Sequence, residues 1–403
     1  MASLSTPRKN ILRGKRLVLL DCMLRECGYD DPEVALEIAN GFDLVGVATK
    51  SKALPDSSQP AQLTEADLLS NASAANRGIY FSTKSCGDEA VDEELWRKTC
   101  KEKEAGWLQG PVPFGEIEHE GRLTRRFPVQ QSGKVRCVDN FSESQINDAV
   151  TLQNRVTVDG TDTVSAMCAE KMRALGRSFD LTSAYRQLAI SDRSSRWSRI
   201  AVFNPHTRQT ECFYQYCLPF GARASVTAFI RTARMLQFLA LQIGIVVSCY
   251  FDDFIVLSVP ELAEATEKAF AALLELVGFE YDKTGPKADA MSSEVSALGV
   301  VFDLADSKHG LIRVRNTDRR IEEVTDKIFS TINGKFLSAS EAATLKGRLG
   351  FAEGQLFGRT ARRLINDLGS FAISSSGKAP VTEELKGSLQ AVSKMLKDGK
   401  PRE

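Results

Sequence analysis

The sequence has few of the residues that build disulfide frameworks, zinc sites and histidine-based metal centres. Its 403 residues include nine cysteines, an odd number scattered without a Cys-x-x-Cys pair, which indicates free thiols in a reducing compartment. Only three histidines are present, His119, His206 and His309, and they lie far apart in the sequence. If the protein holds a metal ion, we therefore expect carboxylate ligands.

A long apolar run and a net charge are also missing. The start, residues 1–16, is basic, but the apolar stretch after it is short and interrupted by Asp21, so the sequence predicts neither a secretory signal nor a membrane span. We expect an intracellular protein of the cytoplasm or nucleus that is not secreted and has no membrane partner. The sequence has 52 Lys plus Arg and 52 Asp plus Glu, so the formal net charge is zero and does not indicate a particular class of partner. Residues 171–234, however, hold eleven Lys and Arg against three Asp and Glu, as expected of a segment that handles a polyanion.

Two adjacent carboxylates lie between two apolar runs. The first run leads from Ile243 to Asp252 and Asp253, and the second extends from Phe254 to Leu257. This pattern predicts two strands joined by a two-residue turn made of the Asp pair. Carboxylates side by side repel by roughly 4 kcal/mol at 4 Å with an effective dielectric near 20, and a divalent cation removes that cost. An acidic surface turn without a metal is the alternative interpretation.

A third acid upstream favours the metal site. Asp180 lies between Phe179 and Leu181, where an unpaired carboxylate would be costly. Three carboxylates can hold two metal ions about 3.5–4 Å apart, which is the arrangement used for in-line displacement at phosphorus.

These acids belong to a series of motifs that resembles the palm of a reverse transcriptase. Asp180 is followed five residues later by Tyr185, then by Leu-Pro-Phe-Gly at residues 218–221 and by Tyr-Phe-Asp-Asp at residues 250–253. Their order and spacing match that family, and the Leu-Pro-Phe-Gly motif is closest to retrotransposons of the gypsy and DIRS types. The resemblance covers roughly residues 127–363.

The resemblance implies an α+β fold, the right-hand polymerase with fingers, a palm made of an antiparallel sheet backed by helices, and a helical thumb. Residues 1–122 would form an N-terminal extension of unknown role that is partly disordered. Residues 123–315 would form the fingers and palm, 316–373 the helical thumb or connection, and 374–403 a linker and a C-terminal helix. About forty residues after Arg363 are too few for a ribonuclease H or integrase domain.

The implied reaction transfers a nucleotidyl group from a deoxynucleoside triphosphate to a primer 3′-hydroxyl on an RNA or DNA template. By the resemblance, Asp180 and Asp252 bridge two Mg²⁺ ions, for which Mn²⁺ can substitute, and Asp253 assists. The carbonyl of Leu181 adds a ligand.

The resemblance also implies a nucleotide pocket. Tyr185 would exclude a 2′-hydroxyl by overlap, although a core tyrosine is the alternative interpretation. Lys287 would donate charge or a proton to pyrophosphate. The other residues expected at the pocket are Ala184, Phe220 and Gly221.

Residues 127–131 and 134–139 read as two strands around a Ser132-Gly133 turn, a fingers hairpin. Lys134 and Arg136 lie two positions apart, so both side chains leave the same face and can grip a triphosphate. Ordinary exposed strand charges are the alternative.

A basic helix face is predicted to contact nucleic acid. On a helix over residues 223–242, Arg223, Arg231 and Arg234 fall within a face roughly 80° wide. A helix over residues 338–355, opened by a Ser338 capping box, adds Lys346 and Arg348. A merely solvated face is the alternative for the arginines.

Two weaker expectations concern local structure. Residues 1–16 are predicted to be a flexible basic arm. Residues 199–203 and 209–216 alternate as paired strands and are expected to extend the palm sheet beside the strands that carry the acids.

Two other functions stay open at this point. An RNA-dependent RNA polymerase shares the palm carboxylates, but Tyr185 is bulky where a ribose must fit, and no Gly precedes the Asp pair. A catalytically silent retroelement remnant that only binds nucleic acid would have no need of three acids.

Overall fold

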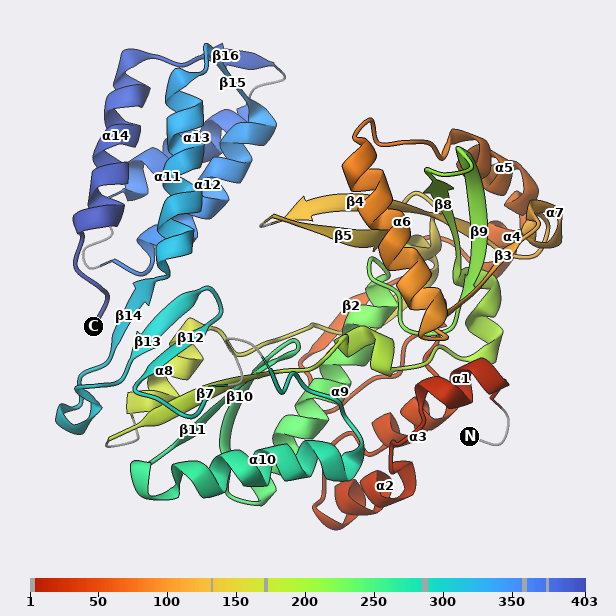
Figure 1. The fold of residues 1–403 in the computed structure, drawn as a ribbon, viewed down its shortest axis with the longest axis horizontal. Helices are drawn as coiled ribbons and strands as arrows, with labels where there is room; N and C mark the ends of the chain where they lie inside the picture. Colours follow the sequence, from red (N-terminus) through yellow and green to blue (C-terminus); the bar gives the residue numbers. More distant parts are fainter. Residues whose placement is uncertain (1–3, 132, 170–172, 285–288, 357–360, 375–376) are drawn as a thin grey trace. The chain divides into compact units, whose positions relative to one another are not determined.

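The computed structural model describes residues 4–131, 133–169, 173–284, 289–356, 361–374 and 377–403. The chain folds into two compact units (Figure 1). The first unit contains Met1–Val158, Asp180–Gly244 and Ala269–Asp282. The second contains Asp159–Phe179, Ile245–Lys268 and Lys283–Glu403. Both units are therefore assembled from three separate stretches of chain.

A mixed five-stranded sheet forms much of the first unit, in the order β3-β9-β8-β4-β5. Its β4 strand pairs in parallel with β8 and antiparallel with β5. Helix α6 packs on the sheet and buries Leu95 against Ile200, Val202 and Phe213. These elements span α6 (Glu89–Glu104), β3 (Leu108–Val112), β4 (Leu123–Gln131), β5 (Lys134–Asp139), β8 (Arg199–Asn204) and β9 (Gln209–Gln215).

This sheet confirms one prediction and corrects another. The hairpin β4–β5 closes with Gln131 opposite Lys134, so the turn falls at residues 132–133 as predicted. Strands β8 and β9 are paired as predicted, but they belong to the sheet of this hairpin and not to the sheet that carries the acids. The reason is the parallel register of β4 on β8, with Leu123 opposite Arg199.

Residues 4–16 are ordered, and for them the prediction of a flexible basic arm is wrong. Arg8 is only 2% exposed, and its guanidinium donates to the Asp192 carboxylate at 2.6 Å and to the Ile190 carbonyl at 2.8 Å. An opposite charge compensates the buried cation, so the arm gains a fixed place. The helices here are α1 (Thr6–Ile11), α2 (Leu17–Glu26) and α3 (Glu33–Asn40), and α2 and α3 contact α9 (Arg223–Gln242).

The rest of the first unit is built from short elements around these helices and the sheet. A small sheet has the order β1-β6-β2, and a capping box between Thr64 and Asp67 opens α4. The elements are β1 (Gly46–Val47), β2 (Asp56–Gln59), α4 (Glu65–Ser70), α5 (Ala72–Ser82), α7 (Phe114–Ile117), β6 (Val150–Asn154) and the 3₁₀ turns η1 (Ile146–Ala149), η2 (Ala184–Gln187) and η3 (Asp192–Trp197).

Two three-stranded sheets lie in the second unit. The first has the order β10-β11-β7, and the second has the order β12-β13-β14. Val164, Ile255, Val295 and Phe302 belong to one buried apolar cluster, so the two sheets share a core. The elements are α8 (Thr161–Ala169), β7 (Leu175–Asp180), β10 (Val246–Tyr250), β11 (Asp253–Ser258), β12 (Glu294–Ala297), β13 (Val300–Asp303), β14 (Arg313–Asn316) and the 3₁₀ turns η4 (Pro260–Leu262) and η5 (Ser307–His309). Helix α10 (Ala263–Val277) begins in this unit, and from Ala269 onward it belongs to the first.

Helices that lie side by side complete the second unit (Figure 1). Leu345, Leu349, Leu368 and Leu389 are buried in their common core. The predicted capping box is present, since the Ser338 hydroxyl accepts from the Glu341 amide. The elements are α11 (Asp318–Asn333), β15 (Phe336–Ser338), α12 (Ala339–Glu353), α13 (Arg362–Ser374), β16 (Lys378–Pro380) and α14 (Glu383–Asp398).

The α+β class is confirmed, because helices and mainly antiparallel sheets occur together in the chain. Within the described residues, no helix combines the length and the apolar character that a membrane crossing requires.

The buried pair between Asp31 and Arg231 generates a stability prediction. Both side chains are 2% exposed, and the Arg231 guanidinium donates to both Asp31 oxygens, at 2.7 and 2.8 Å. Asp31→Asn removes a buried charge and should lower the free energy of unfolding by about 3 kcal/mol. Urea denaturation followed by circular dichroism measures the change.

The matched control is Asp21→Asn, which breaks an exposed pair with Arg25 and should cost less than about 0.5 kcal/mol. Equal losses in the two variants would show that burial gives the Asp31 pair no special weight.

Candidate functional site

The Asp252-Asp253 hairpin closes one residue earlier than predicted. In the β10–β11 register Tyr250 lies opposite Asp253, so the two turn residues are Phe251 and Asp252, and Asp253 is the first residue of β11. Phe251 has a φ of +53°, a conformation that non-glycine residues rarely adopt. Such a residue costs about 1–3 kcal/mol and is typical of functional sites. The turn therefore places Asp252 at its tip and Asp253 at the strand end.

Asp180 is the last residue of β7, the strand next to β11 in the sheet. Its backbone carbonyl accepts a hydrogen bond from the Asp282 amide at 2.8 Å, and the Thr182 amide donates to the Glu280 carbonyl at 3.0 Å. Leu181 forms an isolated antiparallel bridge with Tyr281 between these two bonds. Because the flanking residues make the bonds, the N–H and C=O of Leu181 point away from Tyr281. The Leu181 side chain is 3% exposed.

The described residues contain no group of three or more His, Cys, Asp or Glu side chains that could hold a metal ion. Metal binding by Asp180, Leu181, Asp252 and Asp253 therefore stays a prediction. Lys287 lies outside the described residues.

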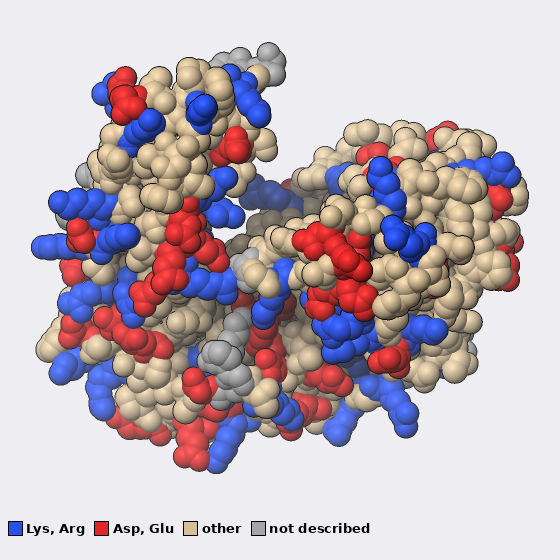
Figure 2. All heavy atoms as spheres, turned by 45° about the horizontal axis from the view of Figure 1, so that its top comes forward, with Lys and Arg blue, Asp and Glu red and all other residues tan. Residues whose placement is uncertain are grey.

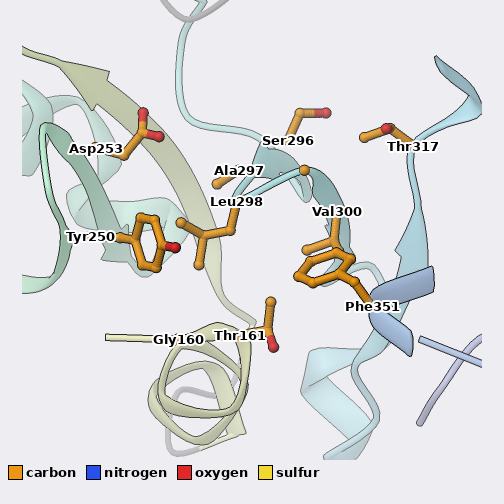
Figure 3. A pocket seen from close by; sticks show the side chains of 11 residues that line it. Gly160, Thr161, Tyr250, Asp253, Ser296, Ala297, Leu298, Val300, Thr317 and Phe351 are labelled. Atoms are coloured by element: carbon orange, nitrogen blue, oxygen red, sulfur yellow. The ribbon is translucent and has the colours of Figure 1, made fainter. Parts of the chain in front are cut away.

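A cavity of about 480 Å³ borders the β10–β11 hairpin in the second unit. Figure 3 shows Tyr250 and Asp253 on one side of it, Leu298 between, and Val300 and Phe351 on the other side. The tight turn between β12 and β13 supplies Leu298, whose φ is +54°. The acidic hairpin thus faces a pocket with an apolar wall.

Tyr185 and Phe220, both predicted at the nucleotide pocket, are in contact in the first unit. The Tyr185 ring centroid is 4.7 Å from that of Phe220 and 4.7 Å from that of Phe229, on which it stacks at 16°. Tyr185 is 8% exposed and Phe220 is 41% exposed. Ala184, the first residue of η2, is buried at 4% exposure. The pair therefore joins a mostly buried ring to an exposed one.

Gly221 fixes the backbone beside Phe220. Its φ is +105°, and a β-carbon there would overlap the Asp139 carbonyl oxygen. The Asp139 amide donates to the Phe220 carbonyl at 3.3 Å, and the Asn147 side chain donates to the Gly221 carbonyl at 3.0 Å. Only glycine fits this close approach of two backbones.

A second cavity, of about 670 Å³, lies in the first unit and brings Arg136 and Phe220 together. Ser183 also lines it, and Lys98, Lys101 and Trp107 contribute cations and an aromatic ring that sequence reasoning missed. The only sequence signal was the three-residue spacing of Lys98 and Lys101 on a charged helix. Lys134 is exposed at the start of β5 but does not line this cavity.

Arg231 does not lie on a nucleic-acid surface, and that prediction is wrong. Its side chain is 2% exposed, and it binds Asp31 and Glu37. Burial disfavours its charge, but the two carboxylates raise the pKa of the guanidinium above its ordinary value. A cation already neutralised inside the fold cannot serve a phosphate.

The other residues predicted to contact nucleic acid differ in how far their side chains are engaged within the protein. Arg223 donates to the Asn147 carbonyl at 3.1 Å and to Gln59 at 2.6 Å, and Arg234 donates to Gln237 at 2.6 Å and to the Thr157 carbonyl at 3.2 Å. The bonds to Asn147, Gln59 and Thr157 hold α9 to other parts of the first unit, whereas Gln237 lies on α9 itself. On α12, Arg348 is exposed and Lys346 is half-buried.

Four of the eleven Lys and Arg in residues 171–234 do not lie on the surface. Arg177, Arg186, Arg199 and Arg231 are all buried. On the face drawn in Figure 2, Lys and Arg are interspersed with Asp and Glu over the described residues. These four arginines therefore cannot contribute to a polyanion-handling surface, and for the other basic residues of the segment that expectation stays a prediction.

Comparison with known proteins identifies the fold. No family model and no curated protein matches the sequence. Among solved structures, the chain resembles a foamy viral protease-reverse transcriptase in complex with an RNA/DNA hybrid, with a TM-score of 0.56 and 16% identity over 87% of this chain and 42% of that one. A second, its dRH form with double-stranded DNA, gives a TM-score of 0.53 and 17% identity over 76% and 48%. A third, with double-stranded DNA, gives 0.53 and 15% over 92% and 68%.

The chain thus has the fold of a nucleic-acid polymerase. More narrowly, it is similar in fold to retroviral reverse transcriptases, and it spans less than half the length of two of the three solved chains.

The Gly221 backbone generates a second prediction. Gly221→Ala places a β-carbon against the Asp139 carbonyl at a positive φ, and it should lower the free energy of unfolding by about 2–5 kcal/mol. Chemical denaturation measures the loss. Gly115→Ala is the control, because Gly115 has open space around it, and its effect should stay within about 1 kcal/mol. A Gly221→Ala variant as stable as wild type would mean that the loop moves freely.

Proposed function

We propose that the protein is an RNA-directed DNA polymerase that extends a primer 3′-hydroxyl with deoxynucleoside triphosphates. The observation that carries the proposal is the sheet β10-β11-β7, in which Asp180 ends one strand and Asp253 begins its neighbour. Gly176 of β7 lies against Val256 and Leu257 of β11.

The donor set suits hard divalent cations, which prefer carboxylate and carbonyl oxygens. Asp180, Asp252 and Asp253 would hold two Mg²⁺ ions with the Leu181 carbonyl, and Mn²⁺ could replace them. When bound, the ions lower the pKa of the primer hydroxyl and neutralise the leaving pyrophosphate. The chain itself fixes the acids, because a tight turn and a strand end leave their backbone little freedom.

The nucleotide pocket is assigned to the Tyr185–Phe220 pair with Ala184 and Gly221. The cavity that Arg136 shares with Phe220 supports this assignment, since a guanidinium can grip a phosphate beside an aromatic wall. Lys134 and Lys287 complete the proposed set of nucleotide contacts.

A primed RNA or DNA template is the proposed macromolecular partner. The similar solved structures were determined with double-stranded DNA and with an RNA/DNA hybrid. On this chain, the cationic side chains Lys346 and Arg348 of α12 are assigned to the duplex backbone. The Leu-Pro-Phe-Gly motif supports a gypsy- or DIRS-type retrotransposon origin, and nine free thiols support an intracellular site.

The catalytic assignment is tested with Asp252→Asn. Loss of one carboxylate from the turn should lower Mg²⁺-dependent primer extension on poly-rA/oligo-dT by about 10³-fold, while primer-template binding stays largely intact. Extension rates and fluorescence anisotropy of labelled duplex give the two readouts.

Asp30→Asn, an exposed acid of the first unit, is the control and should extend as wild type does. Wild-type binding without any Mg²⁺-dependent extension would instead favour a catalytically silent nucleic-acid-binding protein.

Sugar choice is tested with Tyr185→Val. Shortening the ring should reduce the preference for deoxynucleotides over ribonucleotides by at least about tenfold, or about 1.4 kcal/mol, because exclusion by overlap disappears. Single-nucleotide addition with both sugars measures kcat/KM. Unchanged selectivity would make Tyr185 a core residue only, and a wild type that prefers ribonucleotides would indicate an RNA polymerase.

A further inference from the structure

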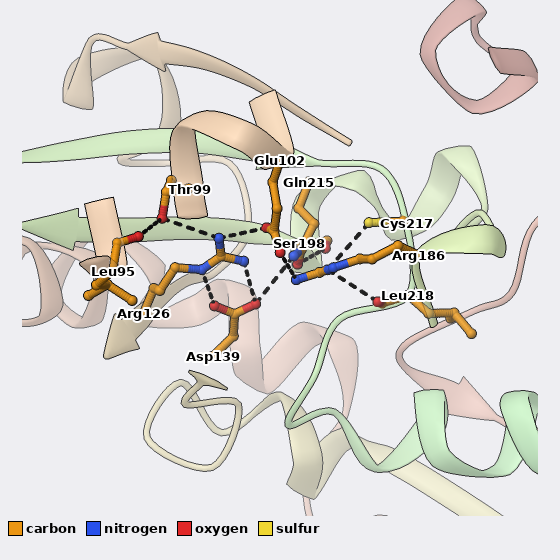
Figure 4. Close-up of polar contacts among 10 residues, drawn as sticks. All are labelled: Leu95, Thr99, Glu102, Arg126, Asp139, Arg186, Ser198, Gln215, Cys217 and Leu218. Atoms are coloured by element: carbon orange, nitrogen blue, oxygen red, sulfur yellow. Dashed lines mark hydrogen bonds and ion pairs between the residues drawn. The ribbon is translucent and has the colours of Figure 1, made fainter. Parts of the chain in front are cut away.

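A buried chain of ion pairs connects three segments of the first unit that carry the proposed nucleotide-pocket residues (Figure 4). Glu102 of α6 stands at its centre and pairs with two arginines. Its carboxylate accepts from Arg186 Nη2 at 2.7 Å and from Arg126 Nη1 at 2.7 Å. Arg126 in turn binds Asp139 through two bonds, at 2.7 and 3.1 Å. Four charged groups from four parts of the sequence therefore form one continuous contact.

Arg186 connects this chain to the loop before Gly221. Its Nη1 donates to the Leu218 carbonyl at 3.3 Å and lies 3.3 Å from Cys217 Sγ. The guanidinium carbon is 5.7 Å from the centroid of the Phe220 ring. Arg186 also directly follows Tyr185 within η2. Arg186 is thus part of the same 3₁₀ turn as Tyr185, and its side chain contacts the loop that contains Phe220.

The contacts form a closed ring, because Asp139 also contacts the loop of residues 218–221 that Arg186 binds. Its amide donates to the Phe220 carbonyl at 3.3 Å, and its carbonyl leaves no room beside Gly221. Asp139 lies at the end of β5, three residues after Arg136. The ring of contacts therefore includes the fingers strand, the Phe220 loop, η2 and α6.

The charges of the ring are buried and balanced. The Arg126 and Asp139 side chains are 0% exposed, Arg186 is 3% exposed and Glu102 is 14% exposed. Burial alone would raise the pKa of Glu102, but Arg126 and Arg186 together lower it. Apolar side chains of similar volume can stabilise a fold as well as such a network does, so stability does not explain its presence. Hydrogen bonds of fixed direction do explain a fixed position.

We propose that Arg186 is a positioning residue that sets the Tyr185–Phe220 pair against the β4–β5 hairpin, and so sets the shape of the deoxynucleotide pocket. This inference rests on the proposed polymerase function. The planar guanidinium of Arg186 donates to Glu102 from one nitrogen and to the Leu218 carbonyl from another. A lysine ammonium has a single nitrogen and cannot reproduce the geometry of both bonds. Arg186 contacts no reacting atom in this proposal.

The test compares Arg186→Lys with Arg231→Lys. Both replace a buried arginine bound to carboxylates, and Arg231 binds Asp31 and Glu37 instead of the Phe220 loop. A second variant, Glu102→Gln, keeps the Leu218 contact of Arg186 and removes the charge that holds its other end. If Arg186→Lys does not fold, Glu102→Gln carries the test.

Hydrogen exchange of the backbone amides of residues 139, 218, 220 and 221 is measured first, without substrate. Faster exchange in Arg186→Lys and unchanged exchange in Arg231→Lys are expected. In single-nucleotide addition, Arg186→Lys should raise KM for the deoxynucleotide about 10- to 100-fold and weaken sugar discrimination, because a misplacement of about 1 Å has effects of that size. The affinity for primer-template and the melting temperature should follow those of Arg231→Lys.

Equal changes in both lysine variants, or normal loop exchange and normal KM in Arg186→Lys, would overturn the inference. A wild type that extends no primer defeats the proposed function separately. In that case the exchange rates still decide whether Arg186 fixes the loop.

Discussion

A charge taken out of water has to meet an opposite charge or a hydrogen-bonding partner, and this constraint decides where many arginines of the first unit lie. Arg8 meets Asp192, Arg126 meets Asp139 and Glu102, and Arg231 meets Asp31 and Glu37. The partners are close in space and far apart in the sequence. Each pair therefore joins segments that the chain order alone leaves separate, and the N-terminal helices owe their place on the first unit to two of them.

The hairpin that carries Asp252 and Asp253 combines an unusual backbone conformation with an adjacent cavity. Two-residue hairpin turns commonly have a positive φ at their first residue, where glycine or asparagine is usual, but here that residue is the bulky Phe251, next to Asp252. A cavity borders this hairpin, and the strand next to β11 in the sheet ends in Asp180. In the first unit, Phe220, which contacts Tyr185, lines a cavity together with Lys98, Lys101 and Arg136.

Local patterns in the sequence were reliable, whereas long-range pairing was not. The helix over residues 223–242 was predicted to within its ends, because the Leu-Pro-Phe-Gly segment breaks the chain before it and Gly244 follows it. The capping box at Ser338 was also local. The alternation of apolar and polar residues predicted strands β8 and β9. It could not predict that β8 pairs with β4, which precedes it by about 75 residues. Arg231 read as a surface cation because its carboxylate partners lie about 200 residues upstream. The turn was predicted at Asp252 and Asp253, but it lies one residue earlier because Tyr250 and Asp253 form the last pair of the β10–β11 hairpin.

The division of the first unit among three stretches of chain has a consequence for its synthesis. Lys15 donates to the Gly278 carbonyl at 3.0 Å, and Gly278 packs directly on Gly14, so the turn between α1 and α2 contacts a segment that is synthesised much later. At about 5–20 residues per second, the ribosome needs roughly 6–25 s to travel from the end of the first stretch to the end of the third. During that interval the apolar faces of α2 and α3 have no complete partner. A nascent chain of this protein is therefore expected to depend on chaperones until residue 282 has emerged.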